Sequence, residues 1–203
     1  MFVRNQEMYH FNNSMKRKEI WIEGNTIDTT SNYVSDIWDS SLNFNAKAQF
    51  NSDEYFSFPV IIDVFLEKEH SKETYTEMLK EASRLLKCYS FLERELVLEE
   101  VRKKYYKRLP SRTSSIYLCD SNQIEYWKEK LTNQNGTSDL FRVEVTGKIF
   151  KSSADLLPKN GESFLTMVEQ AKKYWEADLN NIDDKTSEYL LSGKIKILEK
   201  CKI

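Results

Sequence analysis

Three residues with useful chemistry lie in three separate strand-like segments of this 203-residue chain. His10 lies near the N-terminus, Tyr117 lies in the middle of the chain, and Glu188 opens an apolar Tyr-Leu-Leu run near its end. A carboxylate can stabilise the oxocarbenium ion that forms when an N-glycosidic bond breaks. If the fold brings the three strands together, these residues form a candidate catalytic group for such a reaction.

Each of the three residues also has an ordinary structural interpretation, and both interpretations stay open. His10 lies between two aromatic residues, where a histidine is commonly a partly buried, hydrogen-bonded strand residue. Tyr117 belongs to a residue type that forms strands well and often enters a core. Glu188 follows Lys-Thr-Ser and can simply mark the solvated start of a strand.

A basic segment, Arg108-Leu109-Pro110-Ser111-Arg112, precedes the Tyr117 strand. Arginine binds phosphate in a bidentate manner, so Ser111 and Arg112 are candidate ligands for a pyrophosphate. Alternatively, the basic residues match the dipole at the end of a helix that Pro110 terminates.

We expect no metal site. The cysteines are three in number and widely spaced, and they form no metal signature. His70 lies in a charged helix start and has no expected catalytic task. A carboxylate-rich helix face is expected to be solvated and consists of Glu93, Glu95, Glu99 and Glu100.

Composition narrows the class of protein. Lys and Arg number 30 and Asp and Glu number 32, so the net charge of -2 indicates neither a nucleic-acid nor a membrane partner. No apolar run approaches the roughly 18 residues of a spanning helix. The first residues include no apolar run, so we expect no secretory signal. Free, unpaired thiols fit a reducing compartment, so we expect a cytoplasmic protein.

The apolar periodicity predicts one α+β domain over residues 1–203 with a helical insertion at about 71–109. Within the insertion, Ser71 and Ser90 are expected to cap two successive helices. A long ordered loop with short helical pieces is expected from 29 to 53. Further helices are expected at about 121–131 and 161–176, and strands at 8–12, 18–22, 114–119, 141–145 and 188–198.

In this order of motifs the chain resembles the diphtheria-toxin-like and poly-ADP-ribose-polymerase-like ADP-ribosyltransferases, and an uncharacterised bacterial branch of that superfamily. The segment around Tyr117, running from Ile116 to Ser121 into a helix, is similar to the family's tyrosine motif. Residues 141–147 are similar to the strand that follows it. Glu188-Tyr189-Leu190 resembles the opening of the family's catalytic strand, and Tyr9-His10 takes the place of its first motif.

The resemblance implies a split, mixed or antiparallel sheet with an NAD cleft. It implies that NAD is a substrate, that ADP-ribose moves to an unidentified protein or nucleic acid, and that nicotinamide is released. In this scheme His10 binds a ribose, Tyr117 stacks on nicotinamide, and Glu188 stabilises the oxocarbenium ion. Such enzymes commonly act as toxins or in phage conflict, although no residue here selects that setting.

One departure from the family pattern supports a second hypothesis. Phe11-Asn12 follows His10, where the family has glycine and a small hydroxyl residue that hold the nicotinamide amide and the ribose. The alternative is therefore a catalytically degenerate module that binds a partner through its cleft or through the aromatic-rich segment 29–58. NAD hydrolysis and RNA 2'-phosphate transfer are neighbouring alternatives, and the second usually needs basic residues near the histidine.

Overall fold

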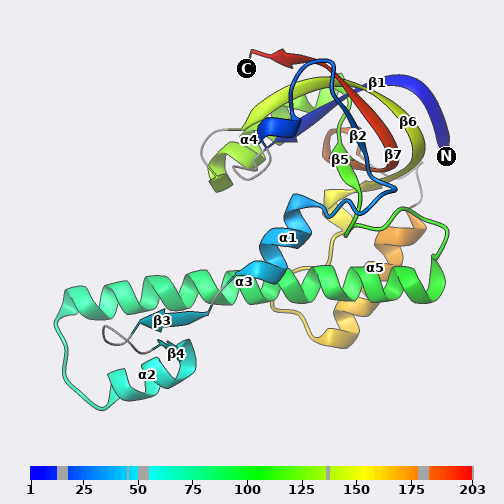
Figure 1. The fold of residues 1–203 in the computed structure, drawn as a ribbon. Coiled ribbons are helices and arrows are strands. Elements are labelled where there is room, and N and C mark those ends of the chain that lie inside the picture. The colour runs from blue at the N-terminus through cyan, green and yellow to red at the C-terminus, as the bar shows by residue number, and fades with distance from the viewer. Residues whose placement is uncertain (13–17, 45, 50–54, 136–137, 178–182, 203) are drawn as a thin grey trace.

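The computed structural model describes residues 1–12, 18–44, 46–49, 55–135, 138–177 and 183–202 (Figure 1). Its strands are β1 (Phe2–Asn12), β2 (Thr26–Asp28), β3 (Lys47–Gln49), β4 (Tyr55–Ser57), β5 (Ile116–Leu118), β6 (Asp139–Ser153) and β7 (Ser187–Cys201). Its α-helices are α1 (Asp36–Asn43), α2 (Phe58–Leu66), α3 (Lys72–Tyr105), α4 (Ile124–Asn135) and α5 (Phe164–Glu176). The expected α+β class is confirmed.

A five-stranded antiparallel sheet is built around the long β6–β7 pair. β1 pairs with the free side of β6, and β2 and β5 pair with the free side of β7. The sheet curls so that β1 and β5, on opposite sides of the β6–β7 pair, meet. Tyr9 of β1 and Cys119 after β5 exchange two backbone hydrogen bonds of 2.9 Å there. The segments around His10 and Tyr117 therefore become neighbours.

The centre of the β6–β7 pair requires glycine on both strands. Gly147 and Gly193 are register partners, with φ of +155° and +157°. A Cβ on Gly193 would lie 2.4 Å from the carbonyl oxygen of Thr146, and one on Gly147 would lie 2.5 Å from that of Ser192. Two L side chains cannot fit at this register position. The two glycines therefore let β6 and β7 approach each other closely.

Two cores lie on the two faces of the sheet. The sheet core, inside the curl, includes Met8, Trp21, Phe141, Ile195 and Ile197. The helix-side core lies between the sheet and helices α3 and α5 (Figure 1), and it includes Leu98, Phe150, Tyr174, Trp175 and Leu190.

α3 forms one continuous helix, whereas the sequence predicted two. Ser71 is its N-cap as expected, accepting a hydrogen bond from the Thr74 amide at 3.3 Å. The prediction of a second start at Ser90 was wrong, because no glycine or proline interrupts residues 72–105 and helical spacing continues through that position. The C-terminal half packs on α5 and the sheet, while the N-terminal half extends beyond them beside α2 and the β3–β4 hairpin (Figure 1).

The strand predicted at 18–22 was also wrong. Lys18–Ile20 form a 3-10 helix, and the next residue, Trp21, is buried in the sheet core at 5% exposure. A single large side chain anchors this segment, so it needs no strand ladder. The predicted loop at 29–53 contains α1 and β3, and its residues 45 and 50–53 lie outside the described part of the chain.

The other strand and helix predictions fall on elements of the same type. The described helices include none that is both long enough and apolar enough to span a bilayer.

Candidate functional site

Glu188 lies at the start of β7 and is 6% exposed. Side chains alternate along a strand, so Glu188 lies on the same side of the sheet as Leu190 of the helix-side core. Its Oε1 atom accepts a hydrogen bond from Arg112 Nη1 at 2.7 Å and another from the Tyr174 hydroxyl at 2.5 Å. Among the described residues, the hydrogen bonds and the ion pair of this carboxylate all fall on Oε1.

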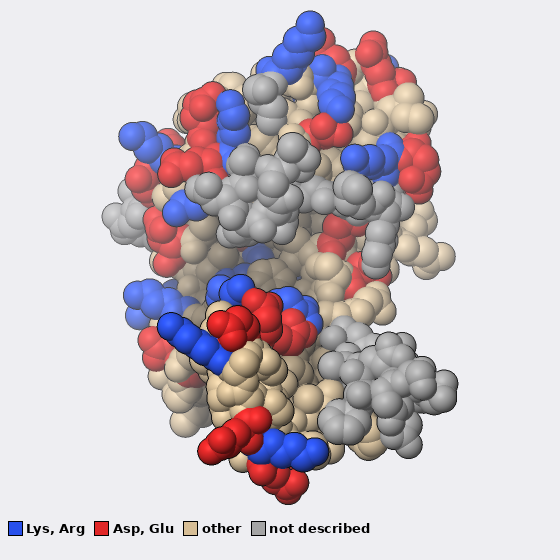
Figure 2. Space-filling view, turned by 90° about the vertical axis from the view of Figure 1, so that its left-hand side faces the viewer, with Lys and Arg blue, Asp and Glu red and all other residues tan. Residues whose placement is uncertain are grey.

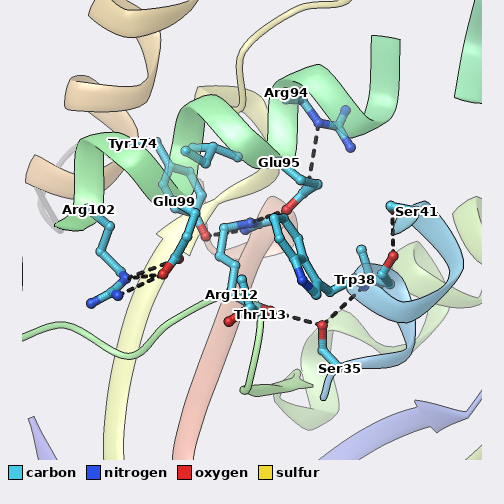
Figure 3. A network of polar contacts seen from close by, with 12 residues as sticks. Ser35, Trp38, Ser41, Arg94, Glu95, Glu99, Arg102, Arg112, Thr113 and Tyr174 are labelled. Atoms are coloured by element: carbon cyan, nitrogen blue, oxygen red, sulfur yellow. Dashed lines mark hydrogen bonds and ion pairs between the residues drawn. The ribbon is translucent and has the colours of Figure 1, made fainter. Parts of the chain in front are cut away.

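Arg112 is the centre of this cluster, at 3% exposure (Figure 3). It donates to both carboxylate oxygens of Glu95, from Nε at 2.8 Å and from Nη2 at 3.1 Å. Its Nη1 also donates to the Tyr174 hydroxyl at 2.6 Å. One guanidinium therefore joins Glu95 of α3, Tyr174 of α5 and Glu188 of β7, and we call these four residues the Arg112 cluster.

The charges in the cluster nearly balance. Arg94 Nε lies 3.5 Å from Glu95 Oε1, which places a second cation against the two carboxylates. Burial lowers the pKa of Arg112, but the nearby carboxylates, Glu95 first, raise that pKa well above its usual value. Burial raises the pKa of Tyr174 well above its usual value. The guanidinium therefore stays charged and the phenol stays protonated, as the hydrogen bond to Glu188 requires.

Tyr117 borders the Arg112 cluster from β5. Its register partner on β7 is Leu190, and its ring centroid lies 5.1 Å from the guanidinium carbon of Arg112. The Tyr117 hydroxyl is buried and has no hydrogen-bond partner among the described residues. Such a buried polar group costs free energy, and a bound ligand or water can satisfy it.

His10 lies close to Tyr117, but its ring belongs to the other core. Its Nδ1 donates to the Tyr117 carbonyl oxygen at 2.8 Å, and its ring stacks on Trp21 at 4.1 Å. Burial lowers the pKa of His10 to about 4, although the hydrogen bond to Tyr117 partly opposes this. The structure thus brings Tyr117, Arg112 and Glu188 together and leaves the His10 ring on the far side of β5.

Ser111 contacts α3 instead of solvent. Its hydroxyl donates to Glu99 Oε1 at 2.9 Å, and Arg102 binds the same carboxylate from Nη2 at 2.7 Å (Figure 3). In this conformation the Ser111 hydroxyl and the Nε and Nη2 atoms of Arg112 are engaged by carboxylates of α3. Their expected role as pyrophosphate ligands stays a prediction, and their observed role is to fasten the segment after Pro110 to the helix.

Comparison with known families places the chain in a family. A family model described as a protein of unknown function, DUF2441, matches residues 8–203. The chain belongs to the DUF2441 family. The matched range includes every residue of the Arg112 cluster together with His10 and Tyr117. A search of curated proteins gave no match for this DUF2441 chain.

Glu95 and Tyr174 of the Arg112 cluster were not predicted as site residues in this DUF2441 chain. Glu95 and the neighbouring Glu99 were expected to be solvated, but they are 1% and 3% exposed. Their helical spacing places them on the same face as Leu98 and Arg102. This spacing can be read from the sequence and indicates that the two carboxylates face the core. Tyr174 lies at helical spacing from Met167 and Ala171, which is typical of a core position and gives no signal for its hydrogen bond to Glu188.

The described residues contain no group of three or more histidine, cysteine or acidic side chains arranged to hold a metal ion. The buried carboxylates of this DUF2441 chain instead face arginines. The chemistry of the site therefore rests on a carboxylate, a guanidinium and two phenols.

Proposed function

We propose that this DUF2441 chain is an NAD-dependent ADP-ribosyltransferase that moves ADP-ribose to a macromolecular acceptor and releases nicotinamide. One observation carries the proposal: Tyr117 and Glu188, far apart in sequence, lie on neighbouring strands and contact the same guanidinium. The two residues come from segments that resemble the tyrosine and glutamate motifs of ADP-ribosyltransferases. Their convergence supports the resemblance at the two positions that matter most for the chemistry.

In the proposed reaction, the bond between the ribose C1 carbon and the nicotinamide nitrogen breaks, and its electron pair leaves with nicotinamide. The acceptor then forms a bond to C1 and loses a proton. Glu188 Oε1 is held by Arg112 and Tyr174, so Oε2 is the oxygen left to face the developing cation. Arg112 and Tyr174 act as positioning residues, because they fix the carboxylate before the reaction begins.

The Tyr117 hydroxyl supports the presence of a ligand site beside the cluster. It is a buried polar atom without a described partner, and a substrate group that hydrogen-bonds to it removes that cost. The Tyr117 ring would supply the stacking surface for nicotinamide. His10 contributes through its bond to the Tyr117 backbone, which positions the strand that carries this ring.

A specific observation favours the alternative of a catalytically degenerate binding module. Arg112 forms an ion pair with Glu188 at 2.7 Å, and a neutralised carboxylate stabilises a cation less well. In addition, the His10 ring is covered by Trp21 and its Nε2 atom is buried. Both observations favour a chain that binds a partner and does not cleave NAD.

The deciding experiment follows nicotinamide release and label transfer from labelled NAD in a cell lysate, for the wild type and Glu188→Gln. Glutamine keeps the size of the side chain and removes its charge, so we expect NAD affinity to change little and the rate to fall by about 10²–10³-fold. Glu199→Gln is the matched control, since Glu199 lies on the same strand but pairs with Arg142 at the surface.

Two outcomes would contradict the proposal in different ways. Activity that survives in Glu188→Gln would move the catalytic carboxylate elsewhere, with Glu144 of β6 the next candidate. A wild-type protein that neither binds nor cleaves NAD would leave the binding module as the better explanation.

A further inference from the structure

The C-terminal end of α3 gathers basic side chains from three parts of the fold. They come from the last turn of α3 with the segment that follows it, from β6, and from α5, which packs against this half of α3 (Figure 1). The ammonium group of Lys148 on β6 donates a hydrogen bond to the Arg108 carbonyl oxygen, so this strand contacts the segment after the helix. We call the following residues the basic surface: Lys104, Lys107, Arg108, Lys148 and Lys172.

An exposed aromatic ring lies among these cations. Tyr105, in the last turn of α3, is 52% exposed. The Nζ atoms of Lys104 and Lys172 lie 5.2 Å and 5.6 Å from its ring centroid, where the electrons of the ring attract a cation. Lysine side chains are flexible, so each ammonium group can leave the ring for a phosphate while a flat ligand stacks in its place. The basic surface therefore offers positive charge and a stacking face together.

Most cations of the basic surface have no carboxylate to neutralise them. Four other cations of α3 each pair with a glutamate three residues earlier, at 2.6 to 3.0 Å. Lys104, Lys107 and Arg108 have no acidic residue at that position, and they form no ion pair with any described residue. Lys148 likewise has no ion pair within the described part of the chain. These four charges are available to an anionic ligand.

Two glutamates of α5 also lie at this end, but both are engaged. Glu169 pairs with Lys172 at 2.7 Å, and Glu176 accepts a hydrogen bond from the Tyr106 hydroxyl at 2.8 Å. Positive charge is therefore in excess here.

The dipole of α3 explains only part of this excess. A helix C-terminus attracts cations of its own last turn, but Lys148 and Lys172 belong to other elements. The excess is also local, because the net charge of the whole chain is -2 and gave no indication of an anionic partner. Figure 2, viewed from the opposite end of α3, shows basic and acidic side chains mixed together. The basic surface therefore differs from the rest of the chain in a way that fits an anionic partner.

We propose that the basic surface binds single-stranded nucleic acid. Phosphates of the strand meet the lysines and the arginine, and an unpaired base stacks on Tyr105. Each phosphate contact with a single strand contributes about -0.7 to the slope of log affinity against log salt, so four unpaired cations give a slope of about -3. Binding without base-specific contacts is weak, with a dissociation constant on the order of 10 μM at about 100 mM salt. This inference does not depend on the proposed enzymatic activity, because binding is measured without NAD.

Fluorescence anisotropy of a labelled oligothymidylate of about 20 nucleotides, titrated with the full chain at about 50–200 mM salt, tests the charge contacts. Over this range the wild-type affinity should fall roughly 50-fold. Lys104→Gln with Lys107→Gln should weaken binding about tenfold or more at about 100 mM salt and make the slope shallower by about 1.4. The matched control is Lys194→Gln with Lys196→Gln, which removes two exposed charges from β7. Absence of binding at about 50 mM salt, or equal weakening by the two double variants, would overturn the proposal.

A second titration tests stacking and the class of partner. Tyr105→Leu should weaken binding about fivefold or more without changing the salt slope, because it removes a stacking face and no charge. Tyr89→Leu is the matched control, since Tyr89 lies on the same helix and is also 52% exposed. Unlabelled oligothymidylate should displace the probe far better than poly-glutamate of equal charge. Equal displacement by poly-glutamate would indicate an acidic protein partner and overturn the proposal, as would an unchanged affinity in Tyr105→Leu.

Discussion

At the scale of single residues, burial decides what each titratable group can do. Arg112 and Glu188 are both buried and lie 2.7 Å apart, so each has an oppositely charged partner. His10 is also buried but has no carboxylate beside it among its described contacts. A buried ionisable group without a charged partner is more stable in its neutral form, and the His10 ring is therefore neutral.

The neutral state of His10 predicts a loss of stability in mild acid. Its pKa is lowered to about 4 in the folded chain from a reference value of 6.5, so the unfolded chain binds more protons between these values. The contribution to stability is complete above pH 6.5 and is lost as the pH falls toward 4. From pH 7 to pH 5 the free energy of unfolding should drop by about 2 kcal/mol from this group.

Urea denaturation at pH 7 and pH 5 measures this loss for the wild type and His10→Gln. Glutamine retains an amide donor for the Tyr117 carbonyl but does not titrate. The variant should therefore lose about 2 kcal/mol less than the wild type over the same interval. Equal losses would show that His10 is accessible to protons in the folded chain.

At the scale of elements, periodicity and caps predicted most of the fold. β6 and β7 have the expected alternation of apolar residues, α5 has the expected helical apolar spacing, and Ser71 caps α3 as expected. The capping pattern at Ser90 failed because a local motif competes with an uninterrupted helix, and the helix prevails when no breaker follows. The curl that joins β1 to β5 depends on long-range pairing that no local pattern encodes.

The glycine pair at the centre of β6 and β7 gives a prediction at this scale. Gly193→Ala should lower the free energy of unfolding by roughly 2 kcal/mol or more, because its Cβ overlaps the backbone of the neighbouring strand. Gly161→Ala is the matched control. It also has positive φ, at +83°, but no atom lies within 4 Å of its Cβ, so it should lose only about 1 kcal/mol.

Urea denaturation ranks the two variants. If Gly161→Ala costs as much as Gly193→Ala, backbone conformation alone accounts for both effects and the close approach of the strands contributes nothing. A larger cost at Gly193 locates the constraint in the pairing of β6 with β7.

At the scale of the whole molecule, the candidate site could be predicted only in part. The order of motifs was enough to select Tyr117 and Glu188 as neighbours, and Arg112 as a nearby basic group. It was not enough to show that Arg112 binds Glu95 and Glu188, because that contact depends on how α3 packs against the start of β7. The His10 ring was assigned to the same group, but the side of β5 that it occupies depends on Trp21.

The Arg112 cluster joins the helical and sheet parts of the chain, so its loss should affect the entire fold. Arg112→Met keeps much of the side-chain volume but leaves Glu188 and Glu95 without their shared cation. Removing one partner from a buried ion pair typically costs about 3–5 kcal/mol, and we expect a loss of this size in urea denaturation. Arg142→Met is the matched control: Arg142 also binds two carboxylates, but at the surface, so it should lose under about 1 kcal/mol.

A second substitution separates charge from packing in the Arg112 cluster. Glu95 still has Arg94 beside it in Arg112→Met, whereas Glu188 has lost its cation. Adding Glu188→Gln removes this uncompensated carboxylate, so the double variant should regain at least about 1 kcal/mol of the loss. If the double variant is less stable than Arg112→Met alone, Glu188 does not carry an uncompensated charge once Arg112 is gone. If Arg112→Met is no more harmful than Arg142→Met, the ion pairs add nothing to stability.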